Sequence, residues 1–371
     1  MPTVPLIHIN HNLLPLSFLY GLGVRFRNQL FDWGLLKGKK YPIPIISIGN
    51  LAVGGTGKTP HTEYLIRLLS RHYRLAVLSR GYKRKSSGFL LATSHSTSRD
   101  IGDEPFQMKQ KFPSILVAVD ADRQRGIETL LNLPQQERPE VILLDDAFQH
   151  RYVIPSLSIL LTDYHCPYYS DKLLPAGRLR EPIEGALRAD IVVVTKCVEG
   201  MTPLDFRIIE ENLHLMANQE LFFSHVSYEN LKALYPQEAP NRNLNRLSAK
   251  ASILLVSGIA SPAPLIQQIK SYGNRVETLC FPDHHDFSQQ DFRKIQETFD
   301  RIKSSDKFIV ATEKDAARLW NHPLLPKAWR KVLYYLPINI QFFLDKQQHF
   351  DNLIIKHIQS YEQQNRNSNL R

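Results

Sequence analysis

The stretch that most constrains the fold of this chain is Ala52-Val53-Gly54-Gly55-Thr56-Gly57-Lys58-Thr59. An apolar run typical of a β-strand precedes it at 43–48, and an amphipathic helical pattern follows at 64–69. Strand, glycine-rich turn, Gly-Lys-Thr and helix, in this order, are typical of a P-loop. Backbone N–H groups of such a turn face phosphate oxygens, and the helix N-terminus adds partial positive charge. The alternative is an ordinary glycine-rich turn that caps a helix.

The residue types in this motif predict separate roles. Lys58 is expected to reach the outer phosphates of a nucleotide, and the Thr59 hydroxyl is expected to ligate Mg²⁺. The motif begins with Ala52, where the usual pattern has glycine. Because alanine is small, we expect the loop to keep its form, so all of 52–59 are candidate nucleotide-binding residues.

The composition is that of a globular protein with room for two domains. The chain has 371 residues, of which 43% are hydrophobic and 22% charged. Its net charge of +10 suits an anionic partner, whether nucleotide, phosphorylated substrate, acidic membrane or nucleic acid. Cys166, Cys197 and Cys280 form no Cys-x-x-Cys pair, so we expect neither a structural zinc site nor a disulfide framework. The N-terminus lacks the basic region of a secretory signal.

A helix is predicted over 13–36, with large apolar residues on one face: Leu19, Leu22, Phe26, Leu30 and Trp33. Arg25 and Arg27 interrupt the apolar run before it reaches the roughly 20 residues that a membrane span needs. Two interpretations remain open at this point. The helix lies in a membrane interface, with the basic residues at 37–40 near headgroups, or it packs on the protein's own core.

Strands alternate with helical patterns up to about residue 200, which predicts an α/β fold with a doubly wound, mostly parallel sheet. The strand at 141–144 ends in Asp145-Asp146, as a Walker B element does, and such carboxylates orient Mg²⁺. Arg80 begins a basic turn after the strand at 74–79, on the edge where open α/β sheets bind ligands. A solvated basic turn is the alternative there.

The chain becomes more polar after Gly200, and a second, smaller α/β domain is predicted beyond it. The expected division is an N-terminal helix at 1–40, a P-loop domain at 41–225, a smaller domain at 226–350 and a polar tail at 351–371, with disorder expected from Gln359 onward. Asp103 stands where a helix is predicted to begin, and the simpler interpretation is that it only caps the N-terminus of that helix. The histidines in 281–286 suggest either a metal site or a polar turn.

Several short motifs occur in one order along the chain. They are Gly49-Asn50, the P-loop through Pro60, 79–82, 102–105, Asp145-Asp146-Ala147-Phe148-Gln149-His150, 174–177 with Arg180-Glu181, Asp283-His284 and 312–315. This ordered set resembles the tetraacyldisaccharide 4′-kinase (lipid A 4′-kinase) family. The resemblance runs from the N-terminal helix to about residue 316. Ala147 departs from it, because the family usually has glycine there.

The resemblance implies a P-loop kinase that moves the γ-phosphate of ATP, with Mg²⁺, to the 4′-hydroxyl of a tetraacyldisaccharide 1-phosphate, giving lipid IVA. It implies peripheral association with the cytoplasmic face of a Gram-negative inner membrane through the N-terminal helix. Neither a nucleic acid nor an obligate protein partner is expected.

The resemblance also implies roles for single residues. Asp103 and His284, from the second domain, resemble the pair that activates the acceptor hydroxyl, and they would assemble when the domains close. Lys58 would stabilise the transferring phosphoryl group, and Asp145 and Asp146 resemble the carboxylates on the metal side. The remaining candidates for phosphate or sugar contact are Arg80, Arg123, Gln149, His150, Arg180 and Glu181.

Three other classes share parts of this pattern. A P-loop GTPase is disfavoured because Val198 replaces the guanine-binding aspartate expected after Thr195-Lys196. A membrane-sorting ATPase would carry an early lysine in the loop, where this chain has Val53. A nucleotide-dependent membrane adaptor would bind nucleotide without phosphate transfer, and the pair Asp103 and His284 is what distinguishes a kinase from it.

Overall fold

The computed structural model describes residues 9–248, 250–259, 262–272, 275–282 and 285–369. The chain divides into two compact units. Unit 1 comprises Met1–Ser96, Phe112–Val226 and Ile340–Arg371, and unit 2 comprises Thr97–Lys111 and Ser227–Asn339. The predicted α/β class with a second, smaller α/β part is confirmed.

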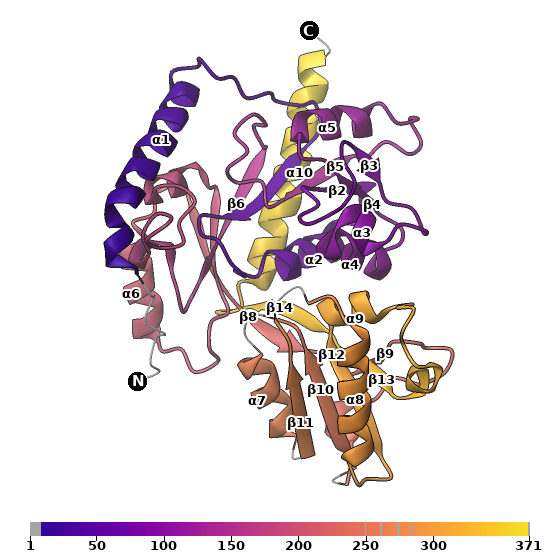
Figure 1. Cartoon of the computed structure of the whole chain (residues 1–371). Coiled ribbons are helices and arrows are strands. Elements are labelled where there is room, and N and C mark those ends of the chain that lie inside the picture. The colour runs from indigo at the N-terminus through magenta and orange to yellow at the C-terminus, as the bar shows by residue number, and fades with distance from the viewer. Residues whose placement is uncertain (1–8, 249, 260–261, 273–274, 283–284, 370–371) are drawn as a thin grey trace. The chain divides into compact units, whose positions relative to one another are not determined.

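The larger sheet, in the described residues, has nine strands in the order β14-β8-β7-β6-β1-β5-β2-β4-β3 (Figure 1). Its strands are β1 Ile45–Asn50, β2 Leu75–Ser79, β3 Leu90–Leu91, β4 Leu116–Val119, β5 Val141–Asp145, β6 Leu157–Asp163, β7 Ile191–Thr195, β8 Glu220–Tyr228 and β14 Ile338–Phe342. Strands β8, β7, β6, β1, β5, β2 and β4 pair in parallel, and β3 pairs antiparallel with β4. All residues of β1, β2, β5 and β7 are buried, which explains their unbroken apolar sequences.

The helices of unit 1 in the described residues are α1 Leu14–Asp32, α2 Lys58–Leu69, α5 Arg123–Leu131, α6 Pro203–Leu213 and α10 Gln347–Asn369, with short 3-10 turns η1 His11–Leu13, η2 Tyr168–Ser170 and η3 Ile183–Arg188. Helices α5 and α6 start at side-chain caps. The Asp122 carboxylate accepts from two backbone N–H groups at the start of α5. A reciprocal Thr202–Asp205 box starts α6, with Pro203 in its first turn.

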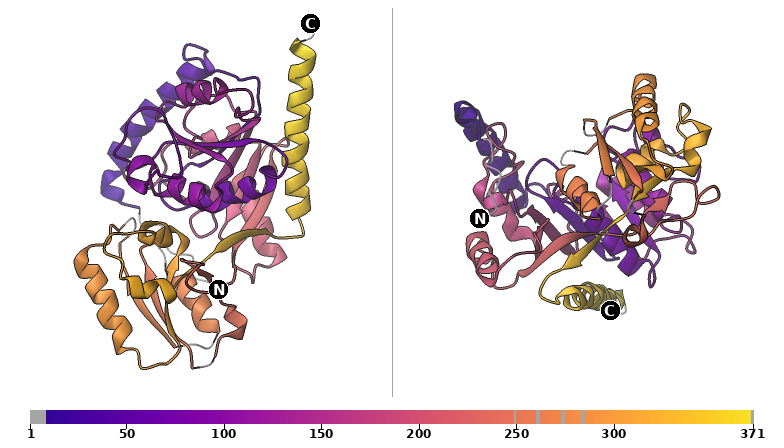
Figure 2. Two further views of the ribbon diagram at one scale, coloured as in Figure 1. Left: turned by 90° about the vertical axis from the view of Figure 1, so that its right-hand side faces the viewer. Right: turned by 90° about the horizontal axis from the view of Figure 1, so that it is seen from below.

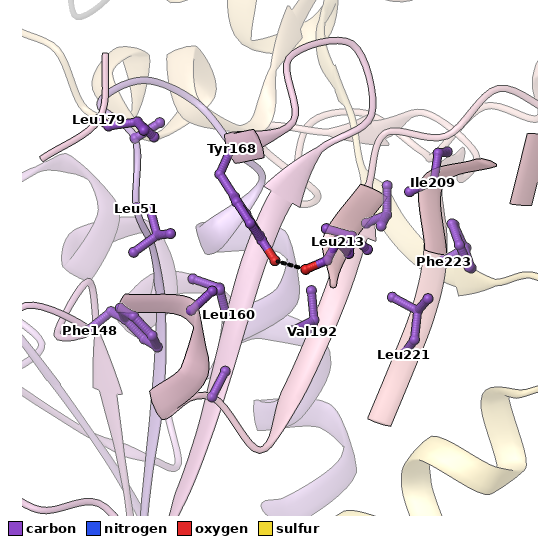
Figure 3. Packing of buried hydrophobic residues seen from close by; sticks show 14 of the residues in the cluster. Leu51, Phe148, Leu160, Tyr168, Leu179, Val192, Ile209, Leu213, Leu221 and Phe223 are labelled. Carbon is purple, nitrogen blue, oxygen red and sulfur yellow. Dashed lines mark hydrogen bonds between the residues drawn. The ribbon is translucent and has the colours of Figure 1, made fainter. Parts of the chain in front are cut away.

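Apolar side chains from β6, β7, β8 and α6 form a continuous core on one side of the larger sheet (Figure 3). Leu160, Val192 and Phe223 come from the strands, and Leu213 comes from the end of α6. The Tyr168 hydroxyl donates to the Leu213 carbonyl at 3.3 Å inside this core. The buried phenol therefore keeps a polar partner, as a buried hydroxyl requires.

The polar tail expected at 351–371 is for the most part helix α10, seen as a long yellow helix beside the rest of unit 1 in Figure 2. Phe350, Ile354 and Ile358 are buried, and their spacing of four places them on one helical face. Tyr64 of α2 donates to Asp351 at 2.6 Å and packs edge-on against Phe350. Sparse apolar residues at helical spacing were enough to dock a segment whose average composition is polar.

Unit 2 is built on a five-stranded sheet in the order β11-β10-β12-β13-β9. Its elements in the described residues are β9 Lys232–Ala233, β10 Ser252–Ser257, β11 Arg275–Cys280, β12 Lys307–Thr312, β13 Leu333–Leu336, α3 Ser98–Ile101, α4 Asp103–Lys111, α7 Ala263–Ser271, α8 Gln289–Arg301, α9 Glu313–Leu319, η4 Leu244–Arg246 and η5 Lys327–Lys331. Its strands pair in parallel except for β9.

Helix α4 belongs to unit 2 although the chain on both sides of α3 and α4 belongs to unit 1. It packs against α9, and Lys111 at its end forms an ion pair with Glu313. The sequence predicts the helix but not this placement, because nothing local marks a long-range contact. The consequence is that Asp103, the first residue of α4, is part of unit 2.

The packing of α10 yields a stability prediction. We expect Ile354→Ala to lower the free energy of unfolding by about 2–5 kcal/mol, because it removes a fully buried side chain and leaves a cavity. The exposed Gln359→Ala control on the same helix should change it by no more than about 0.5 kcal/mol. Urea unfolding followed by circular dichroism measures both, and equal small effects would show that α10 does not contribute to the core.

Candidate active site

The P-loop connects β1 to α2, as the sequence predicts. Gly57 caps α2 with φ +85°, and Gly54 has φ +113°, so both need the left-handed freedom of glycine. Ala52 is 8% exposed and forms an isolated antiparallel bridge with Leu179, and the Val53 N–H donates to the Arg178 carbonyl at 2.7 Å. Extended pairing of this kind suits alanine, which explains why the first position of the loop does not need glycine.

Side chains beneath the P-loop hold it in place. The Asn50 amide donates to the Thr56 hydroxyl at 2.8 Å, and Thr195 of β7 donates to the Thr56 carbonyl at 2.8 Å. His61, in the first turns of α2, lies 2.7 Å from the Gly57 carbonyl through Nδ1. Burial lowers the pKa of His61 to about 4, so its ring is neutral near pH 7. The sequence analysis considered Thr195 only as part of a guanine-binding motif, and it overlooked His61, which belongs to no familiar nucleotide motif.

Lys58 and Arg180 share one carboxylate, that of Asp146. The Lys58 ammonium lies 3.6 Å from Asp146 Oδ1, and Arg180 donates to both oxygens of Asp146 at 3.0 and 3.2 Å. Burial alone would raise the pKa of Asp146, but the charges of Lys58 and Arg180 outweigh it and lower that pKa. Asp146 is therefore ionised near neutral pH and balances one of the two cations.

The backbone at this point explains the departure at Ala147. The left-handed conformation falls on Asp146, with φ +49°, and Ala147 is not among the residues with positive φ. Asp is one of the few residues that tolerate this region. The turn is thus made without glycine at position 147, and the carboxylates keep their places.

Asp145 has a different environment from its neighbour. It is 1% exposed, its Oδ1 accepts from Thr62 of α2 at 3.3 Å, and its Oδ2 accepts from Ser79 at the end of β2 at 3.2 Å. Asp145 therefore ties α2 and β2 to the end of β5, whereas Asp146 faces the P-loop lysine. The sequence predicts both carboxylates but not this separation of their surroundings.

A second group of predicted residues gathers around Arg123 and His150. Arg123 is 2% exposed, donates to the Asp120 carbonyl at 2.7 Å, and has its pKa lowered by burial to about 10. Burial, followed by the charge of Arg123, lowers the pKa of His150 to about 4. After burial, the charge of Arg80 also contributes to both shifts, so Arg80 lies near this group.

Two buried polar atoms of this group, Arg123 Nε and His150 Nε2, have no hydrogen-bond partner among the described residues. Buried polar atoms normally have a partner, so each marks a place where a ligand or water is expected. The structure thus brings three of the predicted substrate-contacting residues to one edge of the sheet.

Two further predicted residues, Gln149 and Glu181, are joined by hydrogen bonds next to the P-loop. The Gln149 amide donates to the Asn50 carbonyl at 2.7 Å and to Glu181 Oε1 at 3.0 Å. Arg188 of η3 donates to Glu181 Oε2 at 2.7 Å, and Glu181 is 2% exposed. Arg188 was not predicted from the sequence, and no local signal distinguishes it from a surface arginine. These hydrogen bonds hold Asn50 at the end of β1, where the P-loop begins.

Asp103 lies in unit 2 and is held by an arginine that the sequence did not reveal. Arg318 of α9 donates to Asp103 Oδ2 through Nε at 3.1 Å and Nη2 at 2.7 Å, and to Asp315 at 3.1 Å. Asp315 is fully buried and accepts from the Gly258 N–H at 2.8 Å. The expected partner His284 lies outside the described residues.

Helix α1 rests on the loop that pairs with the P-loop. The Ser17 hydroxyl donates to the Leu173 carbonyl and accepts from the Ala176 N–H, both at 2.9 Å, and the Tyr20 hydroxyl donates to the Arg180 carbonyl at 2.7 Å. Ser17 and Gly21 are the buried residues of α1. Its large apolar side chains are exposed instead: Leu16, Phe18, Leu19, Leu22, Phe26 and, just after it, Trp33.

Packing on the protein's own core therefore does not account for the apolar face that the sequence shows. In the part of the chain that the structure describes, none of the helices combines the length and the apolarity needed to cross a bilayer.

Comparison with known proteins decides the family. The family model for Tetraacyldisaccharide-1-P 4′-kinase matches residues 9–359. This chain belongs to the tetraacyldisaccharide 4′-kinase family. It is 61% identical over 352 residues to the Tetraacyldisaccharide 4′-kinase of Parabacteroides distasonis, with 95% of each chain covered. It is 51% identical to that of Bacteroides thetaiotaomicron, over 95% of this chain and 94% of the relative.

A solved structure agrees with this assignment. The crystal structure of an "apo" form of LpxK from Aquifex aeolicus in complex with ATP has a TM-score of 0.70 to this chain at 30% identity. The match covers 94% of this chain and 98% of that one. The predicted fold, family and enzyme class, a kinase of lipid A biosynthesis, are confirmed.

The contrast between the two aspartates is testable. We expect Asp145→Ala to lower the free energy of unfolding by about 1–3 kcal/mol, because two buried hydroxyl groups lose their acceptor. Asp146→Ala should change it less, because this carboxylate is 31% exposed. Activity should fall strongly in both. Urea unfolding and kinase assays separate these effects, and equal losses of stability would contradict the division of roles.

Proposed function

We propose that this tetraacyldisaccharide 4′-kinase uses ATP as phosphate donor and transfers its γ-phosphate to the 4′-hydroxyl of tetraacyldisaccharide 1-phosphate, giving lipid IVA. The observation that carries this proposal is the ordered P-loop with Lys58 and Arg180 next to Asp146. Two cations against one carboxylate leave positive charge at the place where triphosphate oxygens bind in a P-loop. The arriving phosphates would compete with Asp146 for these cations.

The donor groups at the loop suit Mg²⁺. Mg²⁺ is held by one or two carboxylates and a hydroxyl, with the other positions filled by water and substrate phosphates. Thr59 at the start of α2 and Asp146 beside Lys58 would hold it. Asp145 would help to position α2 through its hydrogen bond with Thr62. No group of three acidic, histidine or cysteine side chains among the described residues forms a metal cage by itself. When bound, the ion would neutralise charge on the phosphates.

Asp103 is proposed as the base that takes the proton of the acceptor hydroxyl. The ion pair with Arg318 favours its ionised form, which is the form that accepts a proton. Arg318 grips one oxygen, Oδ2, with two N–H groups, and thereby fixes the direction of the carboxylate. The family resemblance supplies His284 as its partner, which would orient the same group.

The reaction and the base are tested together. Purified protein is incubated with γ-labelled ATP, Mg²⁺ and tetraacyldisaccharide 1-phosphate in detergent. We expect label on the lipid, and a rate lower by about 10²–10⁴-fold in Asp103→Asn, because general base catalysis is removed. Asp300→Asn makes the same chemical change at an exposed position of unit 2 and should match the wild type.

The outcomes separate the claims. ATP bound without any label on the lipid would contradict the proposed reaction and favour an adaptor. Equal labelling by Asp103→Asn would leave the reaction standing and remove Asp103 from the role of base.

We further propose that α1 holds the protein at the surface of the membrane that carries its acylated substrate, the cytoplasmic face of the inner membrane. Phe18, Leu19 and Phe26 are each 62% exposed. An apolar helix face next to basic residues suits a membrane interface. Lys37 and Lys40, shortly after α1, are exposed and supply this charge. Because α1 rests on the loop that carries Arg180, the lipid surface would lie near the phosphate site.

Vesicle flotation tests the role of α1. We expect the double variant Leu19→Asp and Phe26→Asp to bind anionic phospholipid vesicles at least about tenfold more weakly, because two exposed apolar side chains no longer enter the interface. Leu204→Asp with Ile208→Asp makes the same change at exposed positions of α6 and should retain binding. Unchanged binding by the α1 variant would contradict this role.

A further inference from the structure

His61 is a buried, bifunctional side chain that the proposed mechanism does not use. It lies one turn into α2 and is 5% exposed. Its Nδ1 is 2.7 Å from the Gly57 carbonyl oxygen, and its Nε2 is 3.0 Å from the Ser224 hydroxyl of β8. The ring therefore bridges the P-loop and a strand 163 residues further along the chain.

The chemistry of the partners fixes the direction of both bonds. A carbonyl oxygen only accepts, so Nδ1 must carry the proton that bonds Gly57. In the neutral ring Nε2 is then an acceptor, and the Ser224 hydroxyl donates to it. Gly57, His61 and Ser224 thus form one directed chain of hydrogen bonds.

The end at the P-loop acts on the groups that would face phosphate. The Gly57 carbonyl and the Lys58 N–H belong to one planar trans peptide, so they point in opposite directions. The His61 ring holds this carbonyl together with the His61 backbone N–H, which lies 3.3 Å from it, so the Lys58 N–H points away from His61. Thr195 does the same for the preceding peptide, because it holds the Thr56 carbonyl at 2.8 Å.

The other end lies in the strand by which the chain leaves unit 1. Ser224 belongs to β8, and the last residues of β8, Ser227 and Tyr228, belong to unit 2. The Ser224 side chain is fully buried, and its backbone carbonyl accepts from the Cys197 N–H at 3.0 Å. Hydrogen bonds therefore connect the P-loop directly to the part of β8 that precedes the entry of the chain into unit 2.

We infer that His61 and Ser224 are a pair of positioning residues that hold the P-loop in its phosphate-binding conformation and link nucleotide occupancy to the order of β8. The inference rests on the ATP binding proposed above. It predicts two separable effects, because the Gly57 bond acts on nucleotide affinity and the Ser224 bond acts on the strand.

Three variants separate the two bonds. His61→Phe keeps the volume of the ring and removes both bonds. His61→Asn places an amide N–H where Nδ1 stands but is too short to reach Ser224. Ser224→Ala removes the second bond, together with the longer 3.4 Å contact between the Ser224 hydroxyl and the Val194 carbonyl, and leaves the Gly57 bond in place. Each is measured by calorimetric titration with ATP, by KM for ATP and for the lipid acceptor, and by amide hydrogen exchange of residues 220–228 with and without ATP.

We expect His61→Phe to raise the Kd and KM for ATP about tenfold, which is the effect of one hydrogen bond, and to leave KM for the lipid unchanged. His61→Asn and Ser224→Ala should bind ATP within about twofold of the wild type. They should lose the protection that ATP gives to the amides of β8 in the wild type. Retention of affinity by His61→Asn is what a merely space-filling role would not produce.

Two results would overturn the inference: wild-type ATP affinity in His61→Phe, or undiminished protection of β8 in both milder variants. If His61→Phe does not fold in a thermal unfolding control, the two milder variants decide through β8 exchange. A wild-type protein that binds no ATP would defeat the proposed function as well. It is distinguished by the first titration, before any variant is compared.

Discussion

The pairing of the segment 171–181 with the P-loop is the constraint on which the rest of unit 1 depends. Ala52 bridges Leu179 in antiparallel fashion, so the loop that would bind phosphate has a second strand-like segment at its side. The same segment receives Ser17 and Tyr20 of α1. One irregular loop therefore positions both the phosphate site and the helix with the exposed apolar face. Because its backbone groups are paired on both sides, this loop is ordered without being a regular element.

The charges at the site follow a consistent arrangement. Asp146 forms ion pairs with two cations, Lys58 and Arg180. The charge of a third, buried cation, Arg123, also contributes to the lowered pKa of Asp146. Burying cations is costly unless anions balance them. The deficit of negative charge in the free protein is thus what a polyphosphate would supply. The charge of Asp145 acts on Arg123, and hydroxyl groups from α2 and β2 donate to both of its oxygens.

Much of this was predictable from the sequence, and the reasons for the misses are physical. Buried parallel strands are recognisable by their apolar runs, and the strand predicted at 141–144 is β5, Val141–Asp145. The P-loop is recognisable because its chemistry demands particular residues at fixed spacing. Arg318 and Arg188 could not be found in this way, because an ion pair across many residues leaves no local pattern. Helix α10 was missed because its three buried apolar side chains stand among many polar residues, so the average composition of the segment is polar.

Helix α1 reverses the usual relation between a helix and its core. It turns Ser17 and Gly21 inward, and an added Cβ at Gly21 would stand 2.7 Å from Leu173 Cδ1, so the Leu173 side chain would have to shift to admit a larger residue there. The inward face thus provides close approach and hydrogen bonds rather than apolar burial. Exposed apolar surface gains nothing from folding alone, since it stays in contact with water. Such a face becomes favourable when another apolar phase covers it, and the membrane attachment proposed for α1 would supply that phase.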